Sequence, residues 1–445
     1  MNSVRLTRAL ALDRKAVVSL VGAGGKTTAM FRLAEELTSE GWRVVTTTTT
    51  MMRREGRCGH TILEAERHVL LEKARRALAD FGRITVASGF SQADGKLIGI
   101  DPSLVDALVT LAEVDAVIVE ADGAKGRSLK APAPYEPVIP GSTSVLLPVA
   151  AADAVGRPLN ERFVHRPEIV ASLARAKLGQ IITPDLVSAV LLHPEGGLKN
   201  APPEARVFPL INKVSYARLE SAREIAGALL KSTRVQRVLL CAVAQDDPVK
   251  EVWGRVAAIV LAAGGSRRFG SPKQLLPWKG KALLEHVLDR VLDSSVDQVV
   301  VVLGHEREAI GALVRDRGVV TVINEDWERG QSGSIRAGLH ALRETCDACL
   351  FVLADQPHVT PELIDSIVAR YRRTLAPIVF PVHRGRRGNP VLFARTLFPE
   401  LLEMQADQGG RQVMERHENE VETVEVHDPT LFLDIDTVDD YEDAR

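Results

Sequence analysis

The sequence predicts an α/β protein of two domains in series, each built on a largely parallel sheet. Short β-branched runs alternate with segments long enough for helices, which is the pattern of βαβ units. The alternation stops at residues 244–254, where AQDDPVKEVWG is polar, contains a proline and has no strong period. A chain of 445 residues is also too long for one ordinary core. We therefore expect domains at residues 1–243 and 255–445, joined by a linker at 244–254.

Each expected element follows from its local pattern. Helices in the first domain are expected at residues 27–40, 62–80 and 216–230, between apolar runs. In the second domain, Thr360 and Pro361 have the residue types of an N-cap and a first helical position. Strands are expected at residues 16–22, 42–50, 83–88, 115–122, 207–213 and 235–243, then at 257–265, 298–304, 319–325, 349–355 and 376–382.

The composition argues against several classes of protein. A formal net charge of −2 gives no overall attraction to nucleic acid or to anionic membranes. No apolar run approaches the roughly 20 residues needed to span a bilayer, and charged residues interrupt the N-terminus before a signal-type core forms. The four cysteines are too scattered for a secreted disulfide framework. We expect a cytoplasmic protein without nucleic-acid or membrane partners.

A glycine-rich loop follows the first strand, in VSLVGAGGKTT at residues 18–28. Backbone N–H groups around Gly22 and Gly25 can wrap a phosphate, aided by the start of the next helix. Lys26 would reach the terminal phosphates of ATP or GTP, and the hydroxyl group of Thr27, followed by Thr28, would bind Mg²⁺. The pattern is a shortened Walker A motif. The alternative is a glycine turn with a solvated lysine, and the flanking strand and helix favour the phosphate loop.

Two carboxylates end the strand at 115–122. Glu120 and Asp122 lie where a carboxylate beside a phosphate loop would hold a metal or orient water, and we assign Asp122 as the metal ligand. The alternative is a pair of loop carboxylates without a function. Thr46–Thr50 reach the same edge of the sheet, where open α/β sheets bind ligands.

A second basic glycine loop, LAAGGSRRFGSPK, occupies residues 261–273. The spacing of its glycines does not fit the dinucleotide fingerprint G-x-G-x-x-G. Its three cations, Arg267, Arg268 and Lys273, match the charge of a triphosphate, and guanidinium groups contact phosphate oxygens two at a time. The alternative is a basic surface turn. We therefore predict a second nucleotide site, with Arg267 and Lys273 in catalytic roles.

Carboxylates for a metal follow later in the second domain. Asp355 ends the strand at 349–355, and since Thr360 already supplies the helix cap, Asp355 is available to Mg²⁺. Asp434 and Asp436 alternate after another apolar run. We predict Asp436 as the second metal ligand, although it could instead only flank a cap formed by Thr437. Cys346 and Cys349 have C-x-x-C spacing without the second pair that a structural zinc site needs, so we expect core cysteines.

The first half resembles the YqeC-type selenium-cofactor proteins, accessories of selenium-dependent molybdenum hydroxylases. The resemblance lies in VGAGGKTT, VVTTTTTMM, VIVEADGAKGRSLKAPAPYEPVIP and INKV, and it covers residues 15–243. It implies a nucleotide-binding accessory domain that supports maturation of an apo molybdenum hydroxylase. Ser215 stands where a guanine-reading N-K-x-D motif has a carboxylate, so ATP and GTP both remain open.

The second half resembles the molybdenum-cofactor cytidylyltransferases and their guanylyl relatives, which have a Rossmann-like nucleotidyltransferase fold. The matching segments are LAAGGSRRFGSPKQLLPW, RGQSGSIRAGL, LADQP, RGNPVLF, ADQGGR and LDIDT, spread over residues 257–441. The resemblance implies that the pterin substrate contacts Asn389, Asp407 and Arg411, where the family more often has histidine at position 389. The nucleotide contacts that it implies are Leu261, Ala262, Ala263, Gly264, Gly265, Arg268, Gly330, Ser332 and Ser334.

These resemblances predict a bifunctional enzyme. Its second domain would transfer CMP from CTP to molybdopterin with release of pyrophosphate, using Mg²⁺ on Asp355 and Asp436. The LAAG opening favours the cytidylyl branch over the guanylyl branch, which generally has LAGG. The alternatives are a guanylyl or sugar-phosphate nucleotidyltransferase, or a non-catalytic chaperone that passes finished cofactor to a molybdenum hydroxylase.

Overall fold

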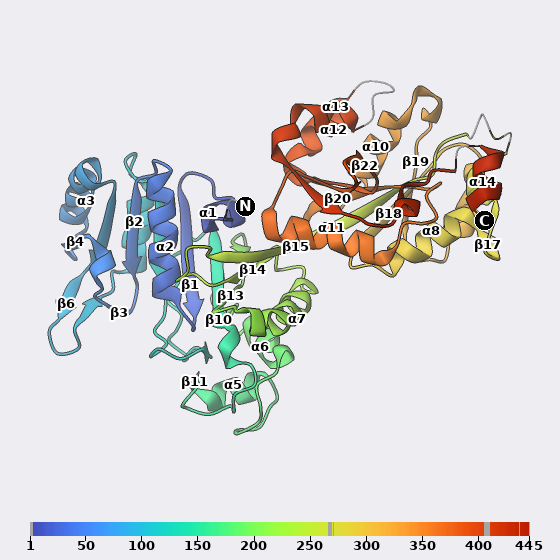
Figure 1. The fold of residues 1–445 in the computed structure, drawn as a ribbon. Helices are drawn as coiled ribbons and strands as arrows, with labels where there is room; N and C mark the ends of the chain where they lie inside the picture. Colours follow the sequence, from blue (N-terminus) through green and yellow to red (C-terminus); the bar gives the residue numbers. More distant parts are fainter. Residues whose placement is uncertain (1–2, 266–268, 270, 405–409, 436, 445) are drawn as a thin grey trace. The chain divides into compact units, whose positions relative to one another are not determined.

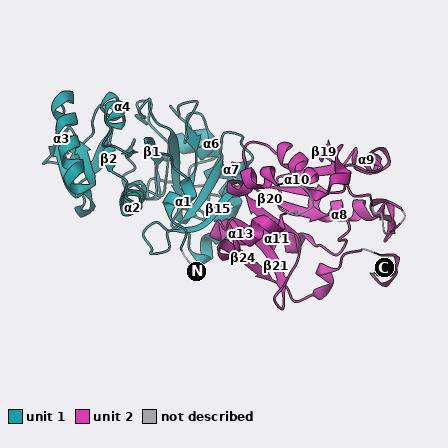
Figure 2. Cartoon of the chain, turned by 90° about the horizontal axis from the view of Figure 1, so that it is seen from above, with its two compact units in different colours: residues 1–253 teal, residues 254–445 magenta. Residues whose placement is uncertain are grey.

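The structure is a computed structural model that describes residues 3–265, 269, 271–404, 410–435 and 437–444. The chain divides into two compact units, Met1–Trp253 (unit 1) and Gly254–Arg445 (unit 2), coloured separately in Figure 2. Both units combine a sheet with helices on its faces, so the α/β class predicted from the alternating pattern is confirmed.

The main sheet of unit 1 is parallel throughout its described pairs. Its strand order is β4-β5-β2-β8-β1-β10-β13-β14, with β12 beside β10, and the strand with the glycine loop lies in its interior (Figure 1). This order places the carboxyl ends of β1 and β8 side by side. The strands are β1 (Ala16–Gly22), β2 (Val44–Thr48), β4 (His60–Leu63), β5 (Arg83–Ala87), β8 (Ala116–Glu120), β10 (Val145–Ala151), β12 (Arg206–Val207), β13 (Leu210–Asn212) and β14 (Arg237–Cys241).

The helices of unit 1 differ from the prediction at one place. The segment expected as a helix at 62–80 contains the end of β4, and the helix α3 begins only at Arg67. Ile62 pairs with Val86 in the sheet, and the Glu66 side chain accepts hydrogen bonds from two backbone N–H groups of the first turn, which fixes the helix start. The helices are α1 (Leu6–Leu10), α2 (Lys26–Ser39), α3 (Arg67–Phe81), α4 (Pro102–Thr110), α5 (Pro167–Leu173), α6 (Pro184–Leu192) and α7 (Leu219–Leu230).

Two small sheets accompany the main one, and the sequence patterns did not predict them. The strands β3 (Met51–Arg53), β7 (Lys96–Ile98) and β6 (Gly89–Ser91) form an antiparallel sheet that follows β2. The strands β9 (Leu129–Lys130) and β11 (Val164–His165) form a parallel pair. Runs of two or three residues are too short for a period to be recognised in the sequence.

The sheet of unit 2 is mixed and mostly parallel. Its order is β19-β18-β15-β20-β23-β21-β24, in which β23 runs antiparallel to both of its neighbours, and the short strand β22 (Arg386–Arg387) also pairs antiparallel with β21. The strands are β15 (Val249–Leu261), β18 (Gln298–Leu303), β19 (Val320–Ile323), β20 (Cys346–Leu353), β21 (Ile378–His383), β23 (Val391–Ala394) and β24 (Val421–Glu425). The helices are α8 (Leu283–Leu292), α9 (Arg307–Val314), α10 (Gln331–His340), α11 (Pro361–Thr374), α12 (Phe398–Glu403), α13 (Arg411–Arg416) and α14 (Val438–Ala444).

The segment predicted as a linker is only partly irregular. Residues 244–248 precede β15, but Val249–Gly254 already belong to that strand, which has 13 residues. The polar residue Glu251 is buried there, and it accepts hydrogen bonds from Arg223 and from the indole of Trp253. A paired carboxylate can stay in a buried strand, so the polar composition of this segment was misleading.

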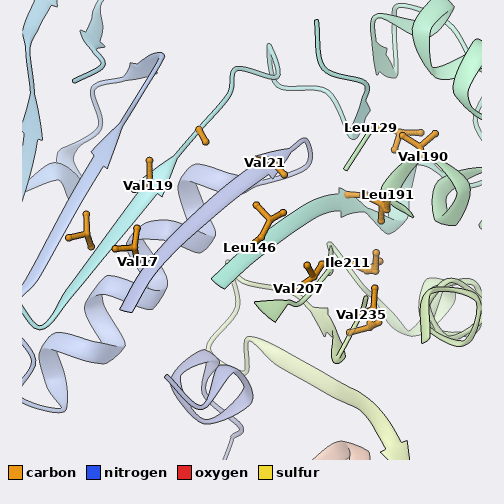
Figure 3. Packing of buried hydrophobic residues seen from close by; sticks show 14 of the residues in the cluster. Val17, Val21, Val119, Leu129, Leu146, Val190, Leu191, Val207, Ile211 and Val235 are labelled. Atoms are coloured by element: carbon orange, nitrogen blue, oxygen red, sulfur yellow. The ribbon is translucent and has the colours of Figure 1, made fainter. Parts of the chain in front are cut away.

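Apolar side chains fill the interior on both faces of the sheets. In unit 1, Val17, Val119, Leu146 and Ile211 come from neighbouring strands and belong to one buried cluster (Figure 3). In unit 2, alternate residues of β15 point to opposite faces, so that Val256, Ala258 and Val260 pack in one cluster and Ala257 and Ile259 in another. The predicted core role of Cys346 and Cys349 is confirmed, because both thiols are buried and free, and burial raises the pKa of Cys346 to about 12.

In the part of the chain that the structure describes, no helix is long and apolar enough to cross a membrane.

Candidate active sites

The site in unit 2 is a cavity of about 350 Å³ at the carboxyl ends of β15 and β20. Seven of the residues predicted from the sequence line it. They are Leu261, Ala263, Gly264, Lys273, Gly330, Ser334 and Asp355. They come from the glycine loop after β15, from the start of α10 and from the end of β20, so the fold brings together three segments that are far apart in the sequence.

Lys273 and Asp355 face each other in this cavity. The Lys273 Nζ atom lies 3.5 Å from an Asp355 carboxylate oxygen, and both residues line the wall. A cation and a carboxylate at this separation can bind different parts of a metal–triphosphate complex. The lysine can contact phosphate oxygens, and the carboxylate can coordinate the metal ion.

The residue before the predicted second carboxylate contacts Asp355 through the backbone. The N–H group of Ile435 donates to the carbonyl oxygen of Asp355 at 3.2 Å, and Asp434 accepts a hydrogen bond from Gln356. Asp436 is the residue after Ile435 and lies outside the described residues, as do Arg267, Arg268 and Asp407. Ile435 therefore lies at the same end of β20 as Asp355. Carboxylate oxygens with substrate phosphates are the ligands that Mg²⁺ takes in such sites.

Other predicted residues shape the cavity without lining it. The carbonyl oxygen of Ala262 accepts from the Gln274 side chain at 3.0 Å. A methyl group at Gly265 would lie 2.7 Å from the Trp327 ring, so only glycine fits there. Ser332 is buried in the first turn of α10.

The two predicted pterin contacts that the structure describes, Asn389 and Arg411, lie outside the cavity lining. Asn389 comes two residues before Val391, which pairs with Phe351, so it reaches the edge of the sheet where β20 ends. Arg411 is the first residue of α13, is largely exposed and pairs with Glu415 at 3.1 Å. Their contact with a substrate therefore remains a prediction.

Among the residues of this site that the sequence analysis does not identify, Gln274, Asn324 and Trp327 have clear structural roles. Gln274 donates to the carbonyl oxygens of both Ala262 and Gly264, which holds the glycine loop in place. Asn324 donates to Ser334 at 3.0 Å and accepts from the N–H group of Asp326, which supports the turn before α10. Trp327 forms one wall of the cavity. Gln274 directly follows the predicted residue Lys273, and this position in the sequence was the one feature that could have indicated its role in the site.

The site in unit 1 is a larger cavity, of about 1390 Å³, around the glycine loop. The loop joins β1 to α2, and a methyl group at Gly22 would lie 2.3 Å from the carbonyl oxygen of Val149. Gly25 has a φ of +119° and precedes Lys26, the first residue of α2. The predicted residues Gly25, Lys26, Thr27 and Thr28 all line the cavity. The loop thus has the close packing and the helix start that a phosphate loop requires.

Lys26 is buried and contacts acidic groups at the end of β8. Its Nζ atom donates to the carbonyl oxygen of Gly22 at 2.6 Å and lies 3.1 Å from Asp122 and 3.8 Å from Glu120. Burial opposes the charged form, but the charges of Asp122 and Glu120 outweigh it and raise the pKa of Lys26. The lysine is therefore charged and held close to the floor of the loop.

Glu120 is hydrogen-bonded to the predicted magnesium ligand Thr27. The Thr27 hydroxyl group donates to Glu120 at 2.6 Å, whereas Asp122 accepts from the Gly22 N–H group and from Lys130. Burial raises the pKa of Glu120, and the charge of Lys26 and the hydrogen bond from Thr27 offset this effect only in part. A hydroxyl and a carboxylate side by side suit a Mg²⁺ ion that also binds phosphate oxygens. Among the described residues, no group of three or more His, Cys, Asp or Glu could hold a metal ion.

Asn212 supports the glycine loop from β13. Its amide donates to the carbonyl oxygen of Gly24 at 2.7 Å and accepts from the Val243 N–H group at 3.1 Å. The asparagine of the INKV segment therefore fixes the loop, a role that the sequence analysis did not assign to it.

The charged residues that follow β8 form a second buried network. Glu136 accepts from Lys130 at 2.9 Å and from Arg166 at 2.7 Å, and these partners lower its pKa to about 2 although burial acts in the opposite direction. Lys130 also contacts Asp122 at 2.8 Å. The network thus connects Arg166, which lines the cavity, through Lys130 and Asp122 to the glycine loop. Of its residues, only Asp122 was identified from the sequence.

Comparison with known proteins covers both units. Residues 18–168 match the YqeC protein family, and residues 258–421 match the MobA-like NTP transferase domain. The chain is 32% identical over 225 residues to the protein YqeC of Escherichia coli (strain K12), which covers 48% of this chain and 84% of that protein. It is 25% identical over 191 residues to the molybdenum cofactor cytidylyltransferase of the same organism, and the match covers 43% of this chain and 95% of that protein. The crystal structure of Rv0371c from Mycobacterium tuberculosis H37Rv is 30% identical, with a TM-score of 0.39, and covers 42% of this chain and 96% of that one.

The cavity of unit 2 and the matched domain define a nucleotidyltransferase of the MobA-like type. The N-terminal part of the sequence matches the YqeC proteins, and the chain belongs to the YqeC family. Both resemblances predicted from the sequence motifs are confirmed.

Proposed function

We propose that unit 2 transfers a cytidylyl group from CTP to the phosphate of molybdopterin and releases pyrophosphate. The single observation that carries this proposal is the placement of Lys273 and Asp355, 3.5 Å apart, in a cavity that the glycine loop and the start of α10 also line. The relationship to a molybdenum cofactor cytidylyltransferase supports the choice of acceptor.

The chemistry follows from the residues that line the cavity. An oxygen of the acceptor phosphate attacks the α-phosphorus in line, its bond to phosphorus forms, and the bond to the bridging oxygen of pyrophosphate breaks. Lys273, with Arg267 and Arg268, would hold the triphosphate, and Asp355 with Asp436 would hold Mg²⁺, which supplies charge neutralisation when bound. Catalysis rests on positioning and electrostatic stabilisation, so no side chain acts as a nucleophile.

The base preference has a direct test. The full chain would be incubated with Mg²⁺ and molybdenum cofactor and with each of the four NTPs, and pyrophosphate release would be measured. We expect release with CTP. Release with GTP but not with CTP would overturn the cytidylyl assignment, and release only with a sugar 1-phosphate as acceptor would overturn the molybdenum-cofactor assignment.

We propose for unit 1 that the glycine loop binds ATP or GTP with Mg²⁺, and that this binding supports maturation of a selenium-dependent molybdenum hydroxylase. The close packing of Gly22, the buried charge of Lys26 and the Thr27–Glu120 contact support nucleotide binding. Thr27 with Glu120 or Asp122 would hold the metal ion.

Calorimetry with ATP and GTP on the full chain and on Lys26→Ala tests this function. Loss of nucleotide binding at this site in the variant is expected, and unchanged binding would overturn it. Capture of an apo molybdenum hydroxylase by the full chain is the corresponding test of the partner, and no retention of that protein would overturn that part.

A further inference from the structure

The cavity of unit 1 is larger than one nucleotide needs. Its volume of about 1390 Å³ exceeds the roughly 300–1,000 Å³ of typical small-molecule pockets. It extends to both sides of the strand that leads into the phosphate loop. Lys213 lines the cavity after β13. Thr50 lines it after β2, and Arg53 and Lys96 line it from the small sheet that follows β2. The strands β13 and β2 lie on opposite sides of β1 in the main sheet. One side therefore has room for a second ligand while a nucleotide occupies the other.

Two cations stand opposite each other on the β2 side. Arg53 of β3 and Lys96 of β7 are direct partners in the antiparallel register, and both line the cavity. The neighbouring pair, Met52 with Leu97, is buried, so the cationic pair projects from the other face. Like charges directly opposite on a sheet repel each other. Within the described ranges, neither side chain forms an ion pair that would relieve this repulsion.

An apolar pair lies beside the cations on the same face. Met51 pairs with Ile98, and each is two residues from a cation in its strand, so all four side chains share one face. Met51 and Ile98 are each 41% exposed, which is high for large apolar side chains. Two cations next to an exposed apolar pair match an anionic group attached to an apolar or aromatic body.

This face is held firmly against the end of β2. A methyl group at Gly99 would lie 2.4 Å from the backbone of Thr49, and the Gly99 N–H group donates to the carbonyl oxygen of Thr50 at 2.5 Å. The N–H group of Ile100 donates to Thr48 at 2.9 Å. The backbone that carries the cationic pair is therefore anchored to the end of β2, so only the two side chains lose freedom when a ligand binds.

We propose that Arg53 and Lys96 bind the phosphate group of a second substrate, a phosphate monoester with an apolar or aromatic body, next to the nucleotide in unit 1. A phosphate dianion balances two cations, and its oxygens fit a guanidinium fork. The proposal rests on the proposed nucleotide binding of the same cavity, and it makes unit 1 a two-substrate site.

The test uses the full chain and phenyl phosphate as the probe. Calorimetric titration would be performed in saturating Mg²⁺ and a non-hydrolysable ATP analogue. We expect phenyl phosphate to bind with one additional equivalent, and the double variant R53A/K96A to weaken this binding by about tenfold or more, since each charged hydrogen bond contributes strongly. Arg57→Ala is the matched control, because Arg57 is exposed nearby and outside the cavity lining, and it should leave the Kd unchanged.

Two further measurements separate this proposal from the nucleotide proposal. Lys26→Ala should lose the nucleotide but keep phenyl phosphate, whereas R53A/K96A should keep the nucleotide. Equal Kd values for phenyl phosphate in the wild type and in R53A/K96A, or no binding to the wild type, would overturn the second site. Benzoate in place of phenyl phosphate should bind at least about tenfold more weakly, and equal affinity would overturn the assignment to phosphate.

Discussion

The hydroxyl group of Thr27 donates a 2.6 Å hydrogen bond to the buried carboxylate of Glu120. This contact joins the first turn of α2 to the last residue of β8. The glycine loop and the acidic strand end, which are about ninety residues apart in the sequence, therefore form one site. The first prediction tests this relationship.

Replacement of Glu120 by glutamine should weaken magnesium-dependent nucleotide binding by about tenfold, because a neutral amide binds Mg²⁺ poorly. The amide can still accept the hydrogen bond from Thr27, so the fold should persist. Calorimetry with and without Mg²⁺ would measure the effect. Glu224→Gln, an exposed change on α7, serves as the control, and equal affinities in the two variants would contradict the role of Glu120.

Asp355→Asn should lower nucleotidyl transfer by about a hundredfold to a thousandfold, the range seen when a group that stabilises transition-state charge is removed. The thermal midpoint should change little, since the side chain lies at the end of a strand and is only partly buried. Asp293→Asn, at the exposed end of α8, is the matched control. Normal turnover in the Asp355 variant would exclude this carboxylate from the reaction.

Asn212→Ala should loosen the glycine loop of unit 1. The change leaves the carbonyl group of Gly24 and the N–H group of Val243 without their side-chain partner, which costs about 1–3 kcal/mol of unfolding free energy. We expect a lower thermal midpoint together with weaker nucleotide binding. If stability falls while the nucleotide Kd stays constant, Asn212 supports the fold but not the shape of the loop.

Glu136 should make the stability of unit 1 dependent on acid pH. Its pKa in the folded protein is about 2, below the ordinary 4.5, so its contribution is fully present above pH 4.5 and is lost as the pH falls toward 2. Glu136→Gln should cost about 3 kcal/mol at pH 7, because Lys130 and Arg166 lose their shared carboxylate.

Urea unfolding of the wild type and of Glu136→Gln at several pH values would measure this contribution. The difference in unfolding free energy should shrink below pH 4.5. A difference that is constant between pH 7 and pH 3 would show that the carboxylate charge is not the source of the stability.

Long apolar strands and glycine loops were predictable from the sequence, because each is a local pattern. The strands that lead into Gly22 and Gly264 and the strand that ends before Asp355 lie where their patterns predicted. The side-chain contacts that support these loops from distant segments were not predictable. Nothing near Asn212 in the sequence indicates that its side chain reaches Gly24, and nothing near Arg53 indicates that Lys96 stands opposite it.

The predicted elements differ from the structure at two places. The segment 62–80 was read as one helix because a strand of four residues was too short to interrupt the apparent period. Residues 244–254 are predicted as a linker because the stretch is polar, contains a proline and has no strong period. The charge of Glu251 is nevertheless compatible with a buried strand, because Arg223 is its partner. That partner lies in α7 and is not visible in the local sequence.

The continuity of β15 decides how the two halves of this protein can be produced separately. A cut in the polar stretch before Val249, where composition suggests it, would remove Glu251 from unit 1 and leave Arg223 without that carboxylate. A gene fragment for the YqeC-type half should therefore extend through Trp253, and a fragment for the transferase half should begin at Gly254, so that β15 is divided between the two polypeptides.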